Sequence, residues 1–108
     1  MKESLIQSSI LEFLTAKHIW AMRINSGMQL GSHNGKRWAI HLASPGTADI
    51  MALLPCYDCD RGFIPLWIEV KNEKGKQSDL QKSFETDVLE RGHRYCIARS
   101  IDDVEAMF

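Results

Sequence analysis

Two acidic residues and a lysine have the types and spacing in this sequence that could do chemistry. Glu69 and Lys71 stand at the end of an apolar run, 63–70, that is typical of a strand. Side chains two positions apart in a strand point to the same face, with about 7 Å between their α-carbons. Asp49 precedes another apolar run, 50–54, and can reach the same place if the two strands are neighbours.

Two carboxylates and an ammonium in this arrangement predict metal-assisted chemistry. Carboxylate oxygens suit a hard divalent cation such as Mg²⁺, and the main-chain oxygen of Val70 could add a ligand. The metal would acidify water and neutralise a phosphate oxygen, while Lys71 orients the water or stabilises charge on the phosphate. The pattern points to phosphodiester hydrolysis. The alternative, a solvated strand face with a weak surface ion pair, stays open.

The predicted elements form an α/β order. An apolar face at Ile6, Ile10 and Leu14 predicts a helix over 5–17, with Ser4 and Gln7 as its capping box. Further expected elements are strands at 20–24, 38–42, 50–54, 63–70 and 94–98 and a helix over 78–91. A last helical turn or two, capped by Ser100, is expected through about 107. The helix before the last strand implies a crossover, so we expect a central mixed sheet flanked by helices.

Two connections are expected to be irregular. The glycine-containing segment 26–37 reads as a flexible loop or an irregular hairpin, and Pro45–Gly46 marks a turn.

Ser78 and Gln81 fit a capping box for the second long helix, and Gly92 suits its end. For Gln81, this capping role is the alternative to a role in a functional site.

Length and composition limit the function classes. The chain has 108 residues, a net charge of −1 and 44% hydrophobic residues, which predicts one folded domain and excludes a uniformly basic nucleic-acid binder. No apolar stretch of about 18 residues is present, so we expect no membrane span and a cytoplasmic protein. Small size makes a dimer reasonable.

The cysteines and tryptophans have ordinary explanations. Cys56 and Cys59 form a CxxC without a second pair, so we expect a turn with two reduced thiols, and a zinc-stabilised interaction domain is the alternative. Trp20 and Trp67 alternate with other residues in expected strands, and we expect both in the core.

The sequence Gly46-Thr47-Ala48-Asp49, followed by Ile68-Glu69-Val70-Lys71, Gly75 and Gln81, resembles the PD-(D/E)XK nuclease superfamily. More narrowly it resembles the VRR-NUC family, including its small stand-alone phage and bacterial members. The resemblance extends from Glu3 through 23–27 to 92–95. It implies one nuclease domain over 1–108 with a restriction-endonuclease-like core, in a bacterial or phage-infected cell.

The resemblance also implies roles for individual residues. It predicts an endonuclease that uses Mg²⁺ or Mn²⁺ to cut DNA, and a homodimer that resolves branched DNA like a Holliday-junction resolvase. The implied metal ligands are Glu3, Asp49, Glu69 and the Val70 carbonyl, and the implied catalytic residues are Asp49, Glu69, Lys71 and Gln81. For Glu3 the alternative is a solvated acid at a helix start.

Basic and polar residues near these positions are candidate DNA contacts. Phosphate contacts are expected from Arg23, Asn25, Ser26, Lys36, Lys74 and Lys76. Ala48 stands where the family commonly has a proline, and the tripeptide that names the family is absent. The alternatives to a junction resolvase are therefore a nuclease of the same fold acting on flap or nicked duplex DNA, and a DNA-binding module without catalysis.

Overall fold

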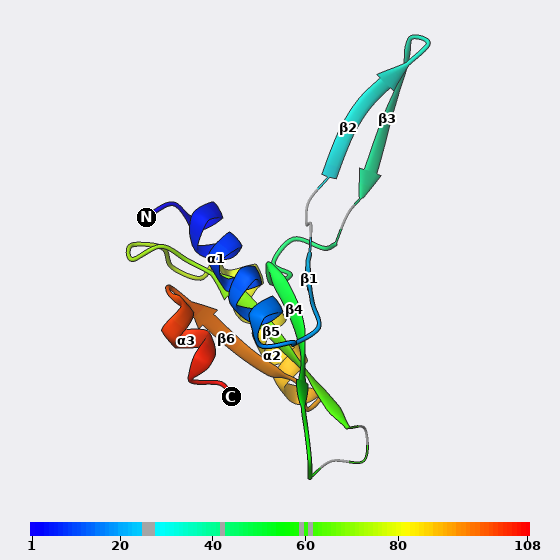
Figure 1. Cartoon of the computed structure of the whole chain (residues 1–108). Helices are drawn as coiled ribbons and strands as arrows, with labels where there is room; N and C mark the ends of the chain where they lie inside the picture. The colour runs from blue at the N-terminus through cyan, green and yellow to red at the C-terminus, as the bar shows by residue number, and fades with distance from the viewer. Residues whose placement is uncertain (25–27, 42, 59, 61) are drawn as a thin grey trace.

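A computed structural model of the chain describes residues 1–24, 28–41, 43–58, 60 and 62–108 (Figure 1). Its helices and strands are α1 (Glu3–Ala16), β1 (Ala21–Arg23), β2 (Met28–His33), β3 (Lys36–His41), β4 (Ile50–Pro55), β5 (Phe63–Val70), α2 (Asp79–Glu90), β6 (Arg94–Ala98) and α3 (Ile101–Glu105). None of the helices in these ranges combines the length and the apolar character needed to cross a membrane.

The main sheet has the strand order β1-β4-β5-β6. Strand β4 runs antiparallel to β1 and β5, whereas β6 runs parallel to β5. Helix α2 makes the crossover between the two parallel strands, because parallel neighbours cannot be joined by a tight turn. The expected central mixed sheet is confirmed.

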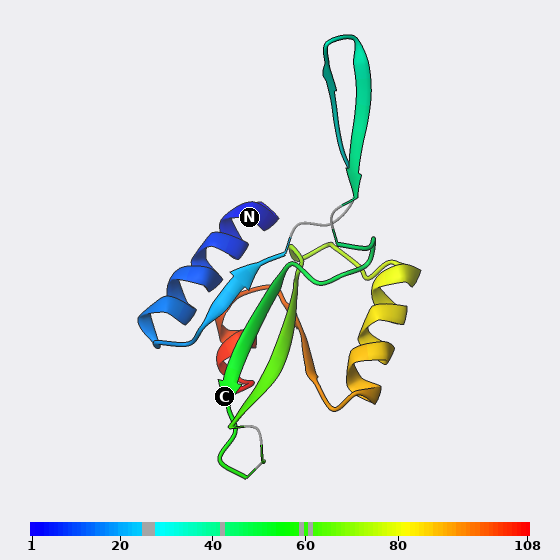
Figure 2. The same cartoon turned by 90° about the vertical axis from the view of Figure 1, so that its right-hand side faces the viewer.

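Helices cover both faces of this sheet (Figures 1 and 2). Side chains of α1 and α3 form the main core with the sheet residues Ile50, Leu66, Ile68 and Val70, all at most 1% exposed. Helix α2 packs on the opposite face, where Val88 joins a smaller cluster. Because side chains alternate along a strand, β5 presents Ile68 and Val70 to α1 and leaves Trp67 and Glu69 on the α2 face.

Three local expectations about the elements are wrong. Helix α1 begins at Glu3 with Lys2 as its N-cap residue, so Ser4 lies inside the first turn and caps nothing. An acid is favourable there because the N-terminal end of a helix carries partial positive charge. Ser100 stands at the N-cap of α3 without a side-chain capping bond. Trp20 is 55% exposed because it lies just before the short edge strand β1 and not in the core.

The segment expected to be a loop or irregular hairpin contains a regular hairpin. Strands β2 and β3 pair antiparallel over six residues each, from Met28 opposite His41 to His33 opposite Lys36. The turn is Asn34–Gly35, with φ of 52° and 77°, the positive values that a two-residue hairpin turn requires. This two-stranded sheet is separate from the main sheet and projects from the body (Figures 1 and 2).

Cys56 follows β4 directly and is disulfide-bonded, so the expectation of a reduced thiol at this position is wrong. Cys59 lies outside the described residues. Cys96 is a buried free thiol in the core, and burial raises its pKa to about 11. It is therefore an unreactive packing residue.

Gly46 fixes the turn that leads into β4. Its φ is +93°, and a Cβ at this position would lie 2.6 Å from the carbonyl oxygen of Leu80 in α2. We expect Gly46→Ala to lower the free energy of unfolding by more than about 2 kcal/mol, because backbone strain and a backbone clash add. Urea unfolding followed by tryptophan fluorescence measures this loss.

Gly92→Ala is the matched control for Gly46→Ala. Gly92 has a similar φ of +82°, but a Cβ added there would meet no atom within 4 Å. Only the backbone strain then remains, so we expect a loss of about 1 kcal/mol. Equal losses in the two variants would contradict the close contact between the turn and α2.

Candidate active site

Asp49 directly precedes β4, at the end of the main sheet where β5 ends. The start of α2 lies near this end of the sheet (Figure 2). The backbone of Asp49 is held on both sides: its N–H donates to the Ile68 carbonyl at 3.0 Å, and its carbonyl accepts from the N–H of Ile24 at 2.7 Å. Its Oδ2 accepts a hydrogen bond from the Val70 N–H at 2.8 Å. Asp49 is thereby fixed against the last residues of β5.

Glu69 is the one charged residue in the core of the described chain, at 3% exposure. It occupies the α2 face of β5, one residue before the strand ends. Its Oε2 accepts a hydrogen bond from Gln81 Nε2 at 3.1 Å and lies 3.7 Å from Lys71 Nζ. Its Oε1 is buried and has no hydrogen-bond partner among the residues that the structure describes. An unpaired buried carboxylate oxygen destabilises the fold, and a bound cation would remove this cost.

The surroundings of Glu69 favour its neutral form when no cation is bound. Burial raises the pKa of Glu69 from 4.5 to about 8, and the Asp49 carboxylate adds to the rise. Lys71 opposes the shift, and Glu3 makes a smaller contribution in the upward direction. Two carboxylates close enough to raise a pKa in this way form a place where a cation is favourable.

Lys71 follows β5 directly, and its N–H donates to the Ala98 carbonyl at 3.0 Å. Its side chain is only 12% exposed. The solvated strand face that was the alternative explanation for Glu69 and Lys71 is therefore excluded by burial, since both side chains are removed from water. Their ion pair at 3.7 Å belongs to a buried site and not to the surface.

Gln81 makes both contacts that were weighed as alternatives. As the third residue of α2 it completes the capping box: its N–H donates to Ser78 Oγ at 3.2 Å, and its Oε1 accepts from the Ser78 N–H at 2.8 Å. Its Nε2 is then directed at Glu69. The capping interaction fixes the rotamer of Gln81, and the amide orients the buried carboxylate.

We refer to Asp49, Glu69, Lys71 and Gln81 as the candidate site, because the structure brings these four residues together. Within the ranges described above, no group of three or more His, Cys, Asp or Glu side chains is arranged to hold a metal. The expected third acid, Glu3, is exposed at the start of α1 and acts on Glu69 only through its charge. The fit for a cation rests on two carboxylates and the unpaired Glu69 oxygen.

The predicted DNA-contacting residues are distributed unevenly. Lys74 and Lys76 are exposed in the loop between β5 and α2, a few residues from Lys71. Arg23 is exposed in β1 and pairs with Ile50, so its side chain starts from the α1 face and not from the face that bears Glu69. Lys36 lies at the tip of the hairpin, away from the candidate site. Asn25 and Ser26 lie outside the described residues.

Arg99 is a supporting residue that the sequence analysis missed. Its guanidinium donates to the carbonyls of Asn72 at 2.5 Å and Gly75 at 2.9 Å, which folds the loop after β5 back on itself. A Cβ on Gly75 would lie 3.1 Å from the Lys71 Cδ, so this loop packs directly on the catalytic candidate. An arginine after a strand matches no local sequence motif. The role of Arg99 follows only from the strand register, which places Ala98 beside Val70 and so brings Arg99 to the loop after β5.

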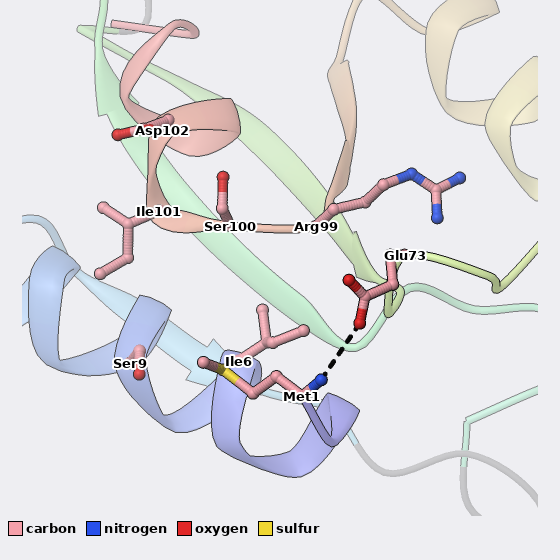
Figure 3. Close-up of a pocket in the computed structure, with 8 residues that line it drawn as sticks. All are labelled: Met1, Ile6, Ser9, Glu73, Arg99, Ser100, Ile101 and Asp102. Carbon is pink, nitrogen blue, oxygen red and sulfur yellow. Dashed lines mark hydrogen bonds and ion pairs between the residues drawn. The ribbon is translucent and has the colours of Figure 1, made fainter.

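An open pocket of about 440 Å³ lies elsewhere, between α1 and the start of α3 (Figure 3). The N-terminal amine contacts the carboxylate of Glu73 there at 3.3 Å (Figure 3). No member of the candidate site lines this pocket. The candidate site is therefore at the end of the main sheet and not in this pocket.

No protein-family model matches the chain, and no curated protein matches it. A solved structure described as a VRR_NUC domain superposes on it with a TM-score of 0.63 at 21% sequence identity. The match covers 97% of this chain and 91% of the other. The chain therefore has the fold of a VRR_NUC domain, and the expected α/β fold with its restriction-endonuclease-like core is confirmed.

Proposed function

We propose that this chain is a VRR-NUC nuclease that hydrolyses phosphodiester bonds in DNA with the help of Mg²⁺ or Mn²⁺. The observation that carries the proposal is the buried, unpartnered Oε1 of Glu69 beside the Asp49 carboxylate. A nearby ammonium, Lys71, completes a set of groups suited to a phosphate and its attacking water. The shared fold with a VRR_NUC domain supports the same assignment.

The residues present fit a hard cation. Asp49 and Glu69 would hold it through carboxylate oxygens, which such ions prefer. The Val70 N–H already points to Asp49, and the carbonyl of an extended residue points to the same side as its N–H, so Val70 can contribute its oxygen. Glu3 would assist through its charge or through water. When bound, the metal supplies Lewis acidity toward water and phosphate.

The protein's own groups do the positioning. Gln81 orients the Glu69 carboxylate, and the Val70 N–H orients that of Asp49. Lys71 is held next to Glu69, where its ammonium can orient the attacking water and stabilise charge on the phosphate in the transition state. Because Glu69 is buried and the Lys71 side chain is only 12% exposed, the electrostatic effect of these groups on a phosphate is stronger than it would be in water.

The preferred DNA is proposed to be branched, cut by a homodimer that presents two sites to a four-way junction. A two-fold protein matches the two-fold character of such a junction. Flap or nicked duplex DNA is the alternative for a nuclease of this fold. A DNA-binding module without catalysis is the alternative of another class.

Cleavage of defined DNA structures tests the proposal. The purified chain is incubated with labelled four-way junction, flap, nicked and linear duplex DNA, with Mg²⁺, Mn²⁺ or EDTA. We expect metal-dependent cleavage, abolished by EDTA, that is fastest on the junction. Binding without cleavage under either metal would favour the non-catalytic module, and equal rates on linear duplex would contradict branched-DNA selectivity.

The two contacts of Gln81 predict different effects for two variants. Ser78→Ala removes the helix cap and leaves the Gln81–Glu69 contact possible, so we expect a stability loss of about 1 kcal/mol and nearly unchanged cleavage. Gln81→Ala also removes the group that orients Glu69, and we expect a further loss in kcat of about tenfold or more. Urea unfolding and steady-state kinetics measure the two effects. Equal kcat values in the two variants would contradict the positioning role.

A further inference from the structure

The β2–β3 hairpin carries positive charge at its exposed tip. Lys36 and Arg37 are both exposed beside the Asn34–Gly35 turn. The charge pattern of the whole chain singles out the same region. The net charge is −1, but all 14 acidic residues lie outside 13–48. A projecting arm without any carboxylate, on a chain that is otherwise acidic, fits a polyanionic partner.

The cations lie on both faces of the hairpin. Residues directly opposite in an antiparallel pair point to the same face, and the two faces alternate along each strand. His33 and Lys36 form one such pair, while Ser32 and Arg37 form the next. Lys36 and Arg37 therefore point to opposite faces of the ribbon. A ribbon lying flat on one phosphate backbone would need cations on one face only.

The strand that precedes the hairpin in sequence, β1, runs beside the candidate site. Ile24, the last described residue before the hairpin, donates its N–H to the Asp49 carbonyl at 2.7 Å. Arg23 pairs with the first residue of β4. The hairpin projects from the end of the main sheet where β4 begins (Figure 1). DNA with a phosphate at Asp49 and Glu69 would therefore lie at the end of the body that bears the arm.

We propose that the β2–β3 hairpin is a DNA-binding arm that enters a groove of the duplex next to the cleavage site and contacts phosphates on both sides. This inference rests on the proposed action on DNA and specifies how the substrate is held. The major groove is about 12 Å wide and admits a two-stranded ribbon, whose strands are about 4.8 Å apart. Six residues per strand give a reach of about 20 Å, or about six base pairs of duplex.

DNA binding without a divalent metal tests the arm separately from cleavage. We expect Lys36→Ala with Arg37→Ala to raise the Kd for a labelled junction about tenfold or more in fluorescence anisotropy. The slope of log Kd against log salt should become shallower by about two, because two phosphate contacts are lost. The matched control is Lys17→Ala with Arg91→Ala, which removes two exposed cations elsewhere, and we expect a much smaller loss.

Duplex length gives a second readout. Shortening a substrate arm from about 15 to about 4 base pairs should weaken wild-type binding and leave the Lys36→Ala, Arg37→Ala variant nearly unaffected. An unchanged Kd and salt slope in that variant would overturn the proposal. A shift of that variant from dimer to monomer in light scattering would also overturn it, because the hairpin would then be a subunit interface. A wild-type chain that binds DNA through the arm but never cleaves it would contradict the proposed function alone.

Discussion

Lys71→Ala is expected to slow DNA cleavage about 10²–10³-fold, the usual effect of removing one group that stabilises developing charge. Lys71 is buried beside Glu69 at the end of β5, and no other lysine or arginine is paired with Glu69 among the described residues. DNA binding should fall much less, because the exposed cations of the loop and the hairpin remain. Single-turnover kinetics at saturating DNA and Mg²⁺ measure the chemical step.

Lys74→Ala is the matched control for Lys71→Ala. It removes the same charge three residues later in the same loop, from an exposed side chain. We expect it to weaken DNA binding modestly and to leave the cleavage rate at saturation within about threefold. If Lys71→Ala cleaved as fast as Lys74→Ala, Lys71 would have no catalytic role.

Glu69→Gln is expected to make the metal-free protein more stable while abolishing cleavage. The pKa of Glu69 is raised to about 8 in the fold, chiefly by burial, and it is about 4.5 in the unfolded chain. Between these values the folded chain holds a proton that the unfolded chain has lost. The free energy of unfolding of the metal-free wild type therefore falls as pH rises from about 4.5 to about 8.

Glutamine does not ionise, so the free energy of unfolding of the variant does not fall in this way as pH rises. We expect a gain of about 2–4 kcal/mol at pH 8, shrinking toward pH 4.5, since one pKa unit corresponds to about 1.4 kcal/mol. The glutamine oxygen can still accept the hydrogen bond from Gln81. Urea unfolding in EDTA across this pH range measures the gain, and Glu90→Gln, at an exposed position, should change stability by less than about 0.5 kcal/mol.

Divalent metal should reverse the order of stability. Mn²⁺ or Mg²⁺ binds only the folded site, so it should raise the Tm of the wild type and leave that of Glu69→Gln nearly unchanged. Because metal must displace the proton of Glu69, metal affinity should increase with pH up to about 8. A metal-free Glu69→Gln variant less stable than wild type at pH 8 would contradict the charge-burial argument.

The elements that form the site were predictable because their signals are local. The apolar run before Glu69 gave β5 with the observed bounds, and Ser78 with Gln81 gave the start of α2. Alternation placed Glu69 and Lys71 on one face, as observed. The roles of these residues remain predictions, since geometry alone does not show catalysis.

The properties that make the site chemically distinctive depend on tertiary packing, which local patterns do not contain. Glu69 is buried because α2 folds over its face of the sheet and directs Gln81 at it. The pKa of Glu69 is raised further by the carboxylate of Asp49, which precedes the neighbouring strand β4. Neither the register of these strands nor the contact of Gly46 with α2 could be predicted from the sequence.

The regular pairing of the hairpin was not predicted, for a different reason. Its glycines were interpreted as flexibility, although Asn34–Gly35 is a strong signal for a two-residue turn. The error matters because the regular ribbon places Lys36 at a projecting tip, not beside the metal candidates. The start of α1 was likewise misplaced: Ser4 was expected as the cap of a helix beginning at residue 5, whereas the helix begins two residues earlier, at Glu3.

The central claim is that Asp49 and Glu69 hold a hard divalent cation. Anomalous diffraction from crystals soaked in Mn²⁺ tests it most directly, with Glu69→Gln crystals as the control. We predict one strong Mn²⁺ peak bonded to the carboxylates of Asp49 and Glu69 in the wild type and its loss in the variant. Ordered Asp49 and Glu69 side chains with no Mn²⁺ between them at saturating concentration would contradict the claim.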